Sequence, residues 1–240
     1  MAYKIGVMMI GSLYWENNQA RVNWRSSRLS KEQFDVFTPI RYGRLSKTRG
    51  STYTMVFSRL CTRKSYGLGS AKVVTCKNTA NNIDDIIEEA KYLWAAERNM
   101  NGINNRFWAS WGSIGLLCNP NTLFPKNFFS KWSEITTNAG SYGKISHCKS
   151  EAPVLSKNGF FNLPWPTSTK NCQSLSHDII LATAIDPTLD TKTKTYPRAS
   201  KIAQAWKEDT ENNDKYFWEN RRNGIHTFQD NTIISFLKKA

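Results

Sequence analysis

The stretch from Ile83 to Glu97 constrains the fold more than any other part of the chain. Its apolar residues recur every three or four positions, which is the spacing of one face of an α-helix. Asn81 or Asn82 can cap its start, and acidic residues follow in the first turn, where the helix dipole favours them. The apolar positions make one continuous stripe, so the helix must pack against another part of the chain.

The segments around this helix are typical of β-strands. Before the helix, apolar, β-branched and aromatic residues gather in short runs, and after it residues 107–117 predict one or two buried strands. The runs before the helix span residues 4–10, 34–40, 52–60 and 71–76. Residues 21–30 and 176–185 fit a strand or a helix equally well.

The second half of the chain is less regular. Residues 138–169 are rich in Gly, Ser, Pro and Lys and predict a long connection. Three short helices are expected near 199–207, 213–221 and 231–238, with Asp230 capping the last.

These features together predict an α+β fold. We expect a small twisted mixed sheet or a partly closed β-barrel, with the helix 83–97 packed on it and a helix-rich C-terminal portion. Residues 1–137 would form the core. Residues 138–240 would supply the irregular connection and the C-terminal helices, packed on the same domain.

Basic residues concentrate in the first third of the chain. The whole sequence carries a net charge of +14, and residues 1–77 alone hold 14 Lys and Arg against 3 Asp and Glu. The densest part contains Arg41, Arg44, Lys47 and Arg49. Three interpretations compete: a solvated basic face, a nucleic-acid site with salt-dependent affinity, and a site for an acidic small substrate or a protein partner.

Other broad classes of protein are disfavoured. No run approaches the ~18 apolar residues of a membrane helix, and the apolar run at residues 5–10 is too short for a signal peptide. The five cysteines are scattered and form no CxxC pair, which predicts reduced thiols rather than a zinc or redox site. We therefore expect a cytoplasmic protein without a metal or cofactor.

Glu97 is a charged residue on the apolar face of this helix, because it continues the apolar stripe one turn beyond Leu93 and Trp94. Its carboxylate either points out past the helix end or sits in a pocket lined by Trp94. A second polar feature is the turn of Gly11, Ser12 and Leu13 that follows the first strand. Consecutive backbone N–H groups in such a turn can hold a carboxylate or an oxyanion.

This turn, followed several strands later by a Glu at a helix end, resembles the γ-glutamylcyclotransferase-like superfamily, which includes AIG2-like and BtrG-like proteins. The resemblance covers roughly residues 4–117 and places the Glu 84 residues after Leu13. It implies that Gly11, Ser12 and Leu13 hold the substrate and that Glu97 is the general acid/base. In this family the γ-glutamyl α-amine attacks its own γ-carbonyl and releases 5-oxoproline and an amine.

Two positions depart from the family pattern. Ile10 stands where the family usually has Tyr, and Arg98 follows the Glu where Gly is frequent. The resemblance predicts such an enzyme, or a lyase or acyltransferase relative, in which Arg41 and Arg44 recognise an acidic substrate group. The alternatives are a nucleic-acid-binding accessory factor of a mobile-element or defence system, and a catalytically silent scaffold on the same fold.

Other side chains are assigned structural roles. His177 is expected at a helix start or on the surface, and the acidic residues 84, 85, 88 and 89 form a solvated helix face. Cys118 is interpreted as a core thiol rather than a nucleophile. The aromatic residues Trp108 and Trp111, and those at 216–218, are interpreted as core residues, with base stacking as the alternative.

Overall fold

The protein has an α+β fold, as the sequence predicts. The computed structural model describes residues 2–46, 49–62, 67–100, 102–103, 105–140, 142, 151–209 and 215–238. Within these ranges, seven strands form one mixed sheet in the order β6-β7-β9-β1-β5-β2-β8. These strands are β1 (Ile5–Met9), β2 (Leu29–Thr38), β5 (Gly69–Cys76), β6 (Trp108–Ala109), β7 (Gly112–Cys118), β8 (Thr167–Ser168) and β9 (Ile179–Ile185).

The sheet is open at both edges, so the twisted mixed sheet is observed rather than a closed barrel in the described chain. A separate antiparallel pair consists of β3 (Ile40–Ser46) and β4 (Thr52–Phe57). β1 lies near the centre, antiparallel to β5 and parallel to β9, and all five of its residues are buried. Because β9 follows residue 138 in the chain, both halves of the sequence build one sheet.

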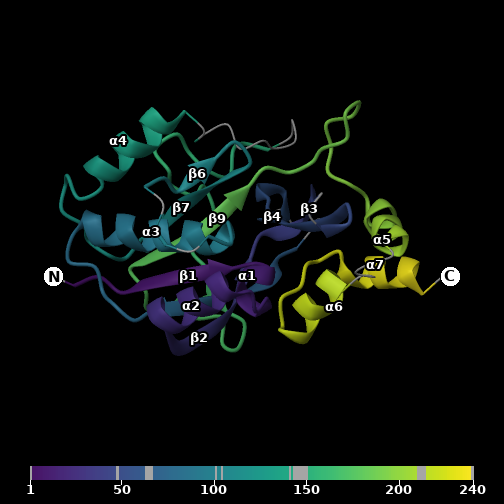
Figure 1. Cartoon of the computed structure of the whole chain (residues 1–240), viewed down its shortest axis with the longest axis horizontal. Coiled ribbons are helices and arrows are strands. Elements are labelled where there is room, and N and C mark those ends of the chain that lie inside the picture. Colours follow the sequence, from purple (N-terminus) through teal and green to yellow (C-terminus); the bar gives the residue numbers. More distant parts are fainter. Residues whose placement is uncertain are drawn as a thin grey trace.

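Helices lie over this sheet, and the C-terminal helices lie beyond one end of it (Figure 1). The helices are α1 (Ser12–Trp15), α2 (Gln19–Arg28), α3 (Ile83–Glu97), α4 (Ser130–Ala139), α5 (Ala199–Glu208), α6 (Lys215–Arg222) and α7 (Asp230–Leu237), with a short 3-10 helix at Arg59–Thr62. Figure 1 shows α5, α6 and α7 gathered beside β3 and β4, at the opposite end of the long axis from α4.

The predicted helix is confirmed with the same bounds, and local hydrogen bonds explain why it starts where it does. The Asn82 side chain accepts hydrogen bonds from the N–H groups of Asp84 and Asp85, and the Asp85 carboxylate accepts from the N–H of Asn82. The ambiguous segment 21–30 is mostly helical because Asn18 caps α2 by accepting from the N–H of Arg21. The Asp230 side chain does not cap α7: it accepts from Thr227 within the preceding turn.

The prediction that all the acidic residues of α3 are solvated is wrong at Glu89. Its side chain is 4% exposed and accepts a hydrogen bond from Nε of Arg28 at 3.2 Å. The Arg28 guanidinium also lies 4.2 Å from the ring centroid of Tyr92. The carboxylate is buried because α2 packs on this flank of α3 and brings its own cation, which the pattern of α3 cannot show.

The expectation that His177 is a surface or helix-start residue is also wrong. The side chain is fully buried, its Nε2 lies 2.8 Å from the Thr75 hydroxyl, and its ring meets Phe34 edge-on. Burial, assisted by the nearby charge of Lys4, lowers the pKa of His177 from 6.5 to about 4. The imidazole is therefore neutral in the folded protein at neutral pH.

This burial makes folding stability sensitive to mild acid. Between pH 6.5 and pH 4 the unfolded chain binds a proton at His177 but the folded chain does not, so the free energy of unfolding falls as the pH drops. We expect a loss of about 3 kcal/mol over this window, since each pKa unit corresponds to about 1.4 kcal/mol. Urea denaturation at several pH values would measure it.

The matched control is His177→Gln, which keeps a polar group near Thr75 but cannot titrate. Carboxylates elsewhere titrate equally in both proteins, so the difference between their pH profiles isolates His177. Parallel profiles for the two proteins would show that the histidine does not contribute.

Candidate functional site

Two features that are distant in the sequence meet in one cavity of about 450 Å³. Gly11, Ser12 and Leu13 follow β1 directly, and Glu97 is the last residue of α3. All four line the cavity, together with side chains from α2, β4, β9 and α6. The packing of α2 against α3 and the central position of β1 bring the turn and the helix end together.

The turn offers backbone donors to this cavity. Gly11 precedes the four-residue helix α1, whose first N–H groups have no acceptor within the helix. The described residues supply no other acceptor for the N–H groups of Ser12 and Leu13. Both side chains are buried, and both residues line the cavity.

Two arginines fix the turn from opposite sides. The Ser12 hydroxyl accepts hydrogen bonds from Nη1 of Arg21 at 2.8 Å and from Nη2 of Arg49 at 2.9 Å. Because two cations donate to this oxygen, and the neighbouring Glu16 carboxylate is paired with the same two arginines, we interpret Ser12 as an anchor and not as a nucleophile.

Glu16 balances these two cations. Burial alone would raise the pKa of Glu16, but the hydrogen bond and charge of Arg49, with the charge of Arg21, hold it below its ordinary value. The Glu16 carboxylate therefore stays ionised and locks both guanidinium groups in place.

Glu97 lies in the pocket rather than past the helix end. Its side chain is 14% exposed, and its Oε2 is 3.6 Å from Nη2 of Arg21. The aromatic wall beside it comes from Trp111, which lines the cavity. Trp94 lies behind that wall, fully buried and stacked on Trp111 with ring centroids 4.8 Å apart.

Arg44 lines the cavity and brings a positive charge to it. Its Nη1 donates to the carbonyl oxygens of Trp111 at 3.1 Å and Asp186 at 3.2 Å. Burial lowers the pKa of Arg44. None of the ion pairs found among the described residues includes Arg44, although the charge of Asp186 acts on it and opposes the effect of burial on its pKa.

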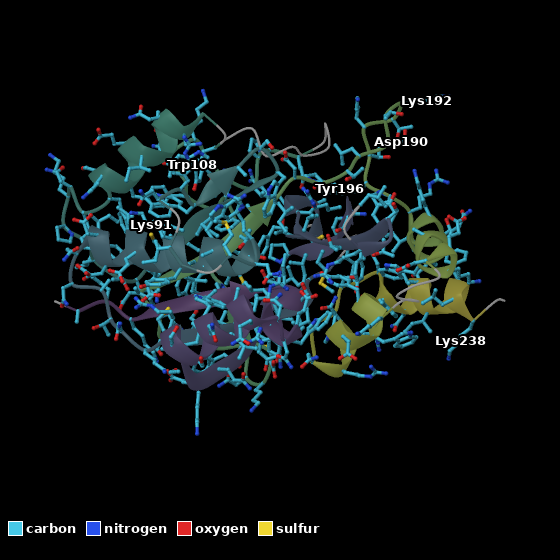
Figure 2. All side chains as sticks on the ribbon, viewed as in Figure 1. Lys91, Trp108, Asp190, Lys192, Tyr196 and Lys238 are labelled. Atoms are coloured by element: carbon cyan, nitrogen blue, oxygen red, sulfur yellow. The ribbon has the colours of Figure 1, made fainter. Side chains whose placement is uncertain are left out.

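Arg41 does not reach this cavity. It is 6% exposed, and its guanidinium lies 4.2 Å from the ring centroid of Tyr196, the residue that Figure 2 labels near the β3–β4 pair. Lys47 lies outside the described residues. With Arg41 buried, Arg44 held by two carbonyls and Arg49 paired with Glu16, these arginines do not form an exposed row that could follow a phosphate backbone.

The sequence did not point to three of the residues that line the cavity. Arg21 lies in a segment whose sequence fits a helix or a strand equally well. The sequence patterns around Trp111 and Tyr216 indicate core residues, with base stacking as the alternative. Only their spatial position identifies them, because α2, the connection between β6 and β7, and α6 meet at the cavity only in the folded chain.

Comparisons of the chain with family models, with curated proteins and with solved structures found no match. The function must therefore be argued from the cavity itself. Within the described ranges, no three His, Cys, Asp or Glu side chains gather as a metal site would require. No helix in those ranges is long and apolar enough to cross a membrane.

Proposed function

We propose that the protein is a γ-glutamylcyclotransferase-like enzyme that acts on a γ-glutamyl amide or a related compound. The observation that carries this proposal is the meeting of Glu97 with the turn Gly11–Leu13 in one cavity. The resemblance in the sequence implies that Glu97 is the general acid/base and that the turn holds the substrate. Leu13 and Glu97 lie 84 residues apart in the chain.

The reaction needs one group that moves a proton, and Glu97 is the carboxylate that lines the cavity. The substrate α-amine attacks its own γ-carbonyl carbon, forming the new C–N bond of the five-membered ring. Glu97 accepts the proton that the attacking nitrogen loses and returns it to the departing amine as the old C–N bond breaks. The products are 5-oxoproline and a free amine, so no proton or electron is left over.

The cationic lining suits a substrate with a carboxylate. Arg21, Arg44, Arg49 and Arg98 line the cavity against the single acid Glu97. Arg21 and Arg49 are already engaged by Ser12 and Glu16, which leaves Arg44 and Arg98; of these two we assign Arg44 to the substrate α-carboxylate, because two carbonyl oxygens hold its guanidinium in place. A guanidinium held by two carbonyls is well placed to make such a bond without further ordering.

The proposal is tested by measuring 5-oxoproline release from a panel of γ-glutamyl peptides and amines. The matched controls are α-glutamyl isomers, whose free γ-carboxyl group carries no amine to release, and N-acetylated γ-glutamyl compounds, whose α-nitrogen is no longer a nucleophilic amine. We expect product from the γ-glutamyl compounds alone. No product from any of them would overturn the proposed chemistry.

Replacing Arg44 with methionine should weaken substrate binding. The substitution keeps an unbranched apolar stem and removes the charge, so we expect KM to rise roughly tenfold, the effect of one charge-assisted hydrogen bond. kcat should change less, because the carboxylate is held equally before and during the reaction. Steady-state kinetics measure both.

Arg222→Met provides the comparison for Arg44. The Arg222 side chain is 69% exposed and pairs with Glu219 of its own helix, so its loss should leave KM unchanged. A KM for Arg44→Met that equals that of Arg222→Met would remove Arg44 from substrate binding.

A further inference from the structure

The phenol of Tyr216 enters the cavity from the C-terminal helices. Tyr216 lies in the first turn of α6, and its side chain is 8% exposed. Its hydroxyl comes so close to Gly11 that a Cβ atom added at position 11 would overlap it. Glycine at this position therefore allows the hydroxyl to reach the substrate-holding turn.

The hydroxyl has a proton to donate. Its oxygen accepts a long hydrogen bond from the N–H of Met55 at 3.4 Å, and the neighbouring Asn220 amide, like that N–H, favours the ionised form of the phenol and so does not take its proton. Burial raises the pKa of Tyr216, so the phenol stays protonated at neutral pH and acts as a donor rather than a base.

The ring is held in place from several sides. The Arg49 guanidinium lies 5.4 Å from its centroid, and Tyr42 meets it edge-on at 6.5 Å. The hydrogen bond from Nε1 of Trp15 to Oδ1 of Asn220 at 2.7 Å ties α1 to α6. The hydroxyl is therefore fixed before any substrate binds, which is the condition under which a donor stabilises a developing charge best.

We infer that the Tyr216 hydroxyl donates a hydrogen bond to the γ-carbonyl oxygen of the substrate as the α-amine attacks the carbonyl carbon. This inference rests on the proposed function and adds a catalytic residue to it. The phenol keeps its own proton throughout and forms no covalent bond. Its bond to oxygen strengthens as negative charge develops there, together with the N–H groups of the turn.

The experiment compares Tyr216→Phe with Tyr42→Phe in the 5-oxoproline assay. Both variants remove one buried hydroxyl from the same aromatic cluster, but Tyr42 does not line the cavity. We expect kcat to fall roughly 10²–10³-fold in Tyr216→Phe, the usual cost of one oxyanion donor, with KM little changed. Tyr42→Phe should keep the wild-type kcat.

The outcomes separate the two proposals. An active wild type with a Tyr216→Phe kcat within about threefold of it, or an equal loss in Tyr42→Phe, overturns the inference and leaves the proposed function standing. A wild type that releases no product overturns both.

A second pair of variants guards against misfolding of Tyr216→Phe. Gly11→Ala should displace the hydroxyl, lowering both kcat and Tm, and adding Tyr216→Phe to it should raise Tm again because the overlap is removed. If the double variant is no more stable than Gly11→Ala alone, the hydroxyl does not lie beside Gly11 and the inference fails.

Discussion

Glu97→Gln is expected to lower 5-oxoproline release by roughly 10²–10⁴-fold, the range contributed by a general acid/base. Glutamine has the same shape but cannot accept the proton of the attacking amine. Arg21 keeps Glu16 as a partner when the charge at position 97 is lost, so the fold should survive. The rate of 5-oxoproline release checks the loss of activity, and the thermal midpoint of the same preparation checks that the fold survives.

The control for this substitution lies on the same helix. Glu88→Gln removes a carboxylate that is half exposed and outside the cavity, so its kcat should match that of the wild type. Glu97→Asp adds a finer test, because it keeps the charge but withdraws it by one methylene, and such misplacement costs about 10²-fold in rate. Full activity in Glu97→Gln would remove Glu97 from the mechanism.

The largest effect on stability is expected at Glu89. Glu89→Ala leaves the Arg28 guanidinium, which is 17% exposed, without its buried partner. Breaking a buried pair in this way costs about 3 kcal/mol, the lower end of the observed range, because the partly exposed Glu88 can still attract Arg28. Chemical denaturation of the variant and the wild type would measure the difference.

Replacing both members of the pair should cost much less. Burial raises the pKa of Glu89 despite the hydrogen bond and charge of Arg28, so for this carboxylate the cost of desolvation outweighs what Arg28 returns. The double variant Arg28→Met with Glu89→Leu removes both charges and fills a similar volume. We expect it to regain most of the stability that Glu89→Ala loses. A double variant as unstable as Glu89→Ala would show that packing, and not the unpaired cation, causes the loss.

The cavity depends on the C-terminal part of the chain as well as on the segment that carries the family resemblance. Residues 4–117 provide the turn and Glu97, whereas β9 and Tyr216 come from beyond residue 138. A site assembled from both halves explains why the turn and the helix end alone do not describe its chemistry. It also makes the proposed role of Tyr216 a property of this architecture.

The sequence by itself determined the elements whose signals are local. The bounds of α3 follow from Asn82 and from a periodic apolar stripe, both of which act within a few residues of each other. The C-terminal helices and most strands were predictable for the same reason. The strand at 179–185 was not, because a short buried apolar run is compatible with either structure until its neighbours are known.

Tertiary structure alone determined the burial and the partners of the charged and titratable groups. The sequence could mark Glu97 and Gly11–Leu13 as unusual, but only the packing of α2, α3 and β1 showed that they share a cavity. Glu89 and His177 were misjudged because burial of a polar group depends on a partner from a distant element, here Arg28 and Thr75. Backbone capping and periodicity act locally, whereas desolvation and charge pairing act through space, so only the folded chain fixes them.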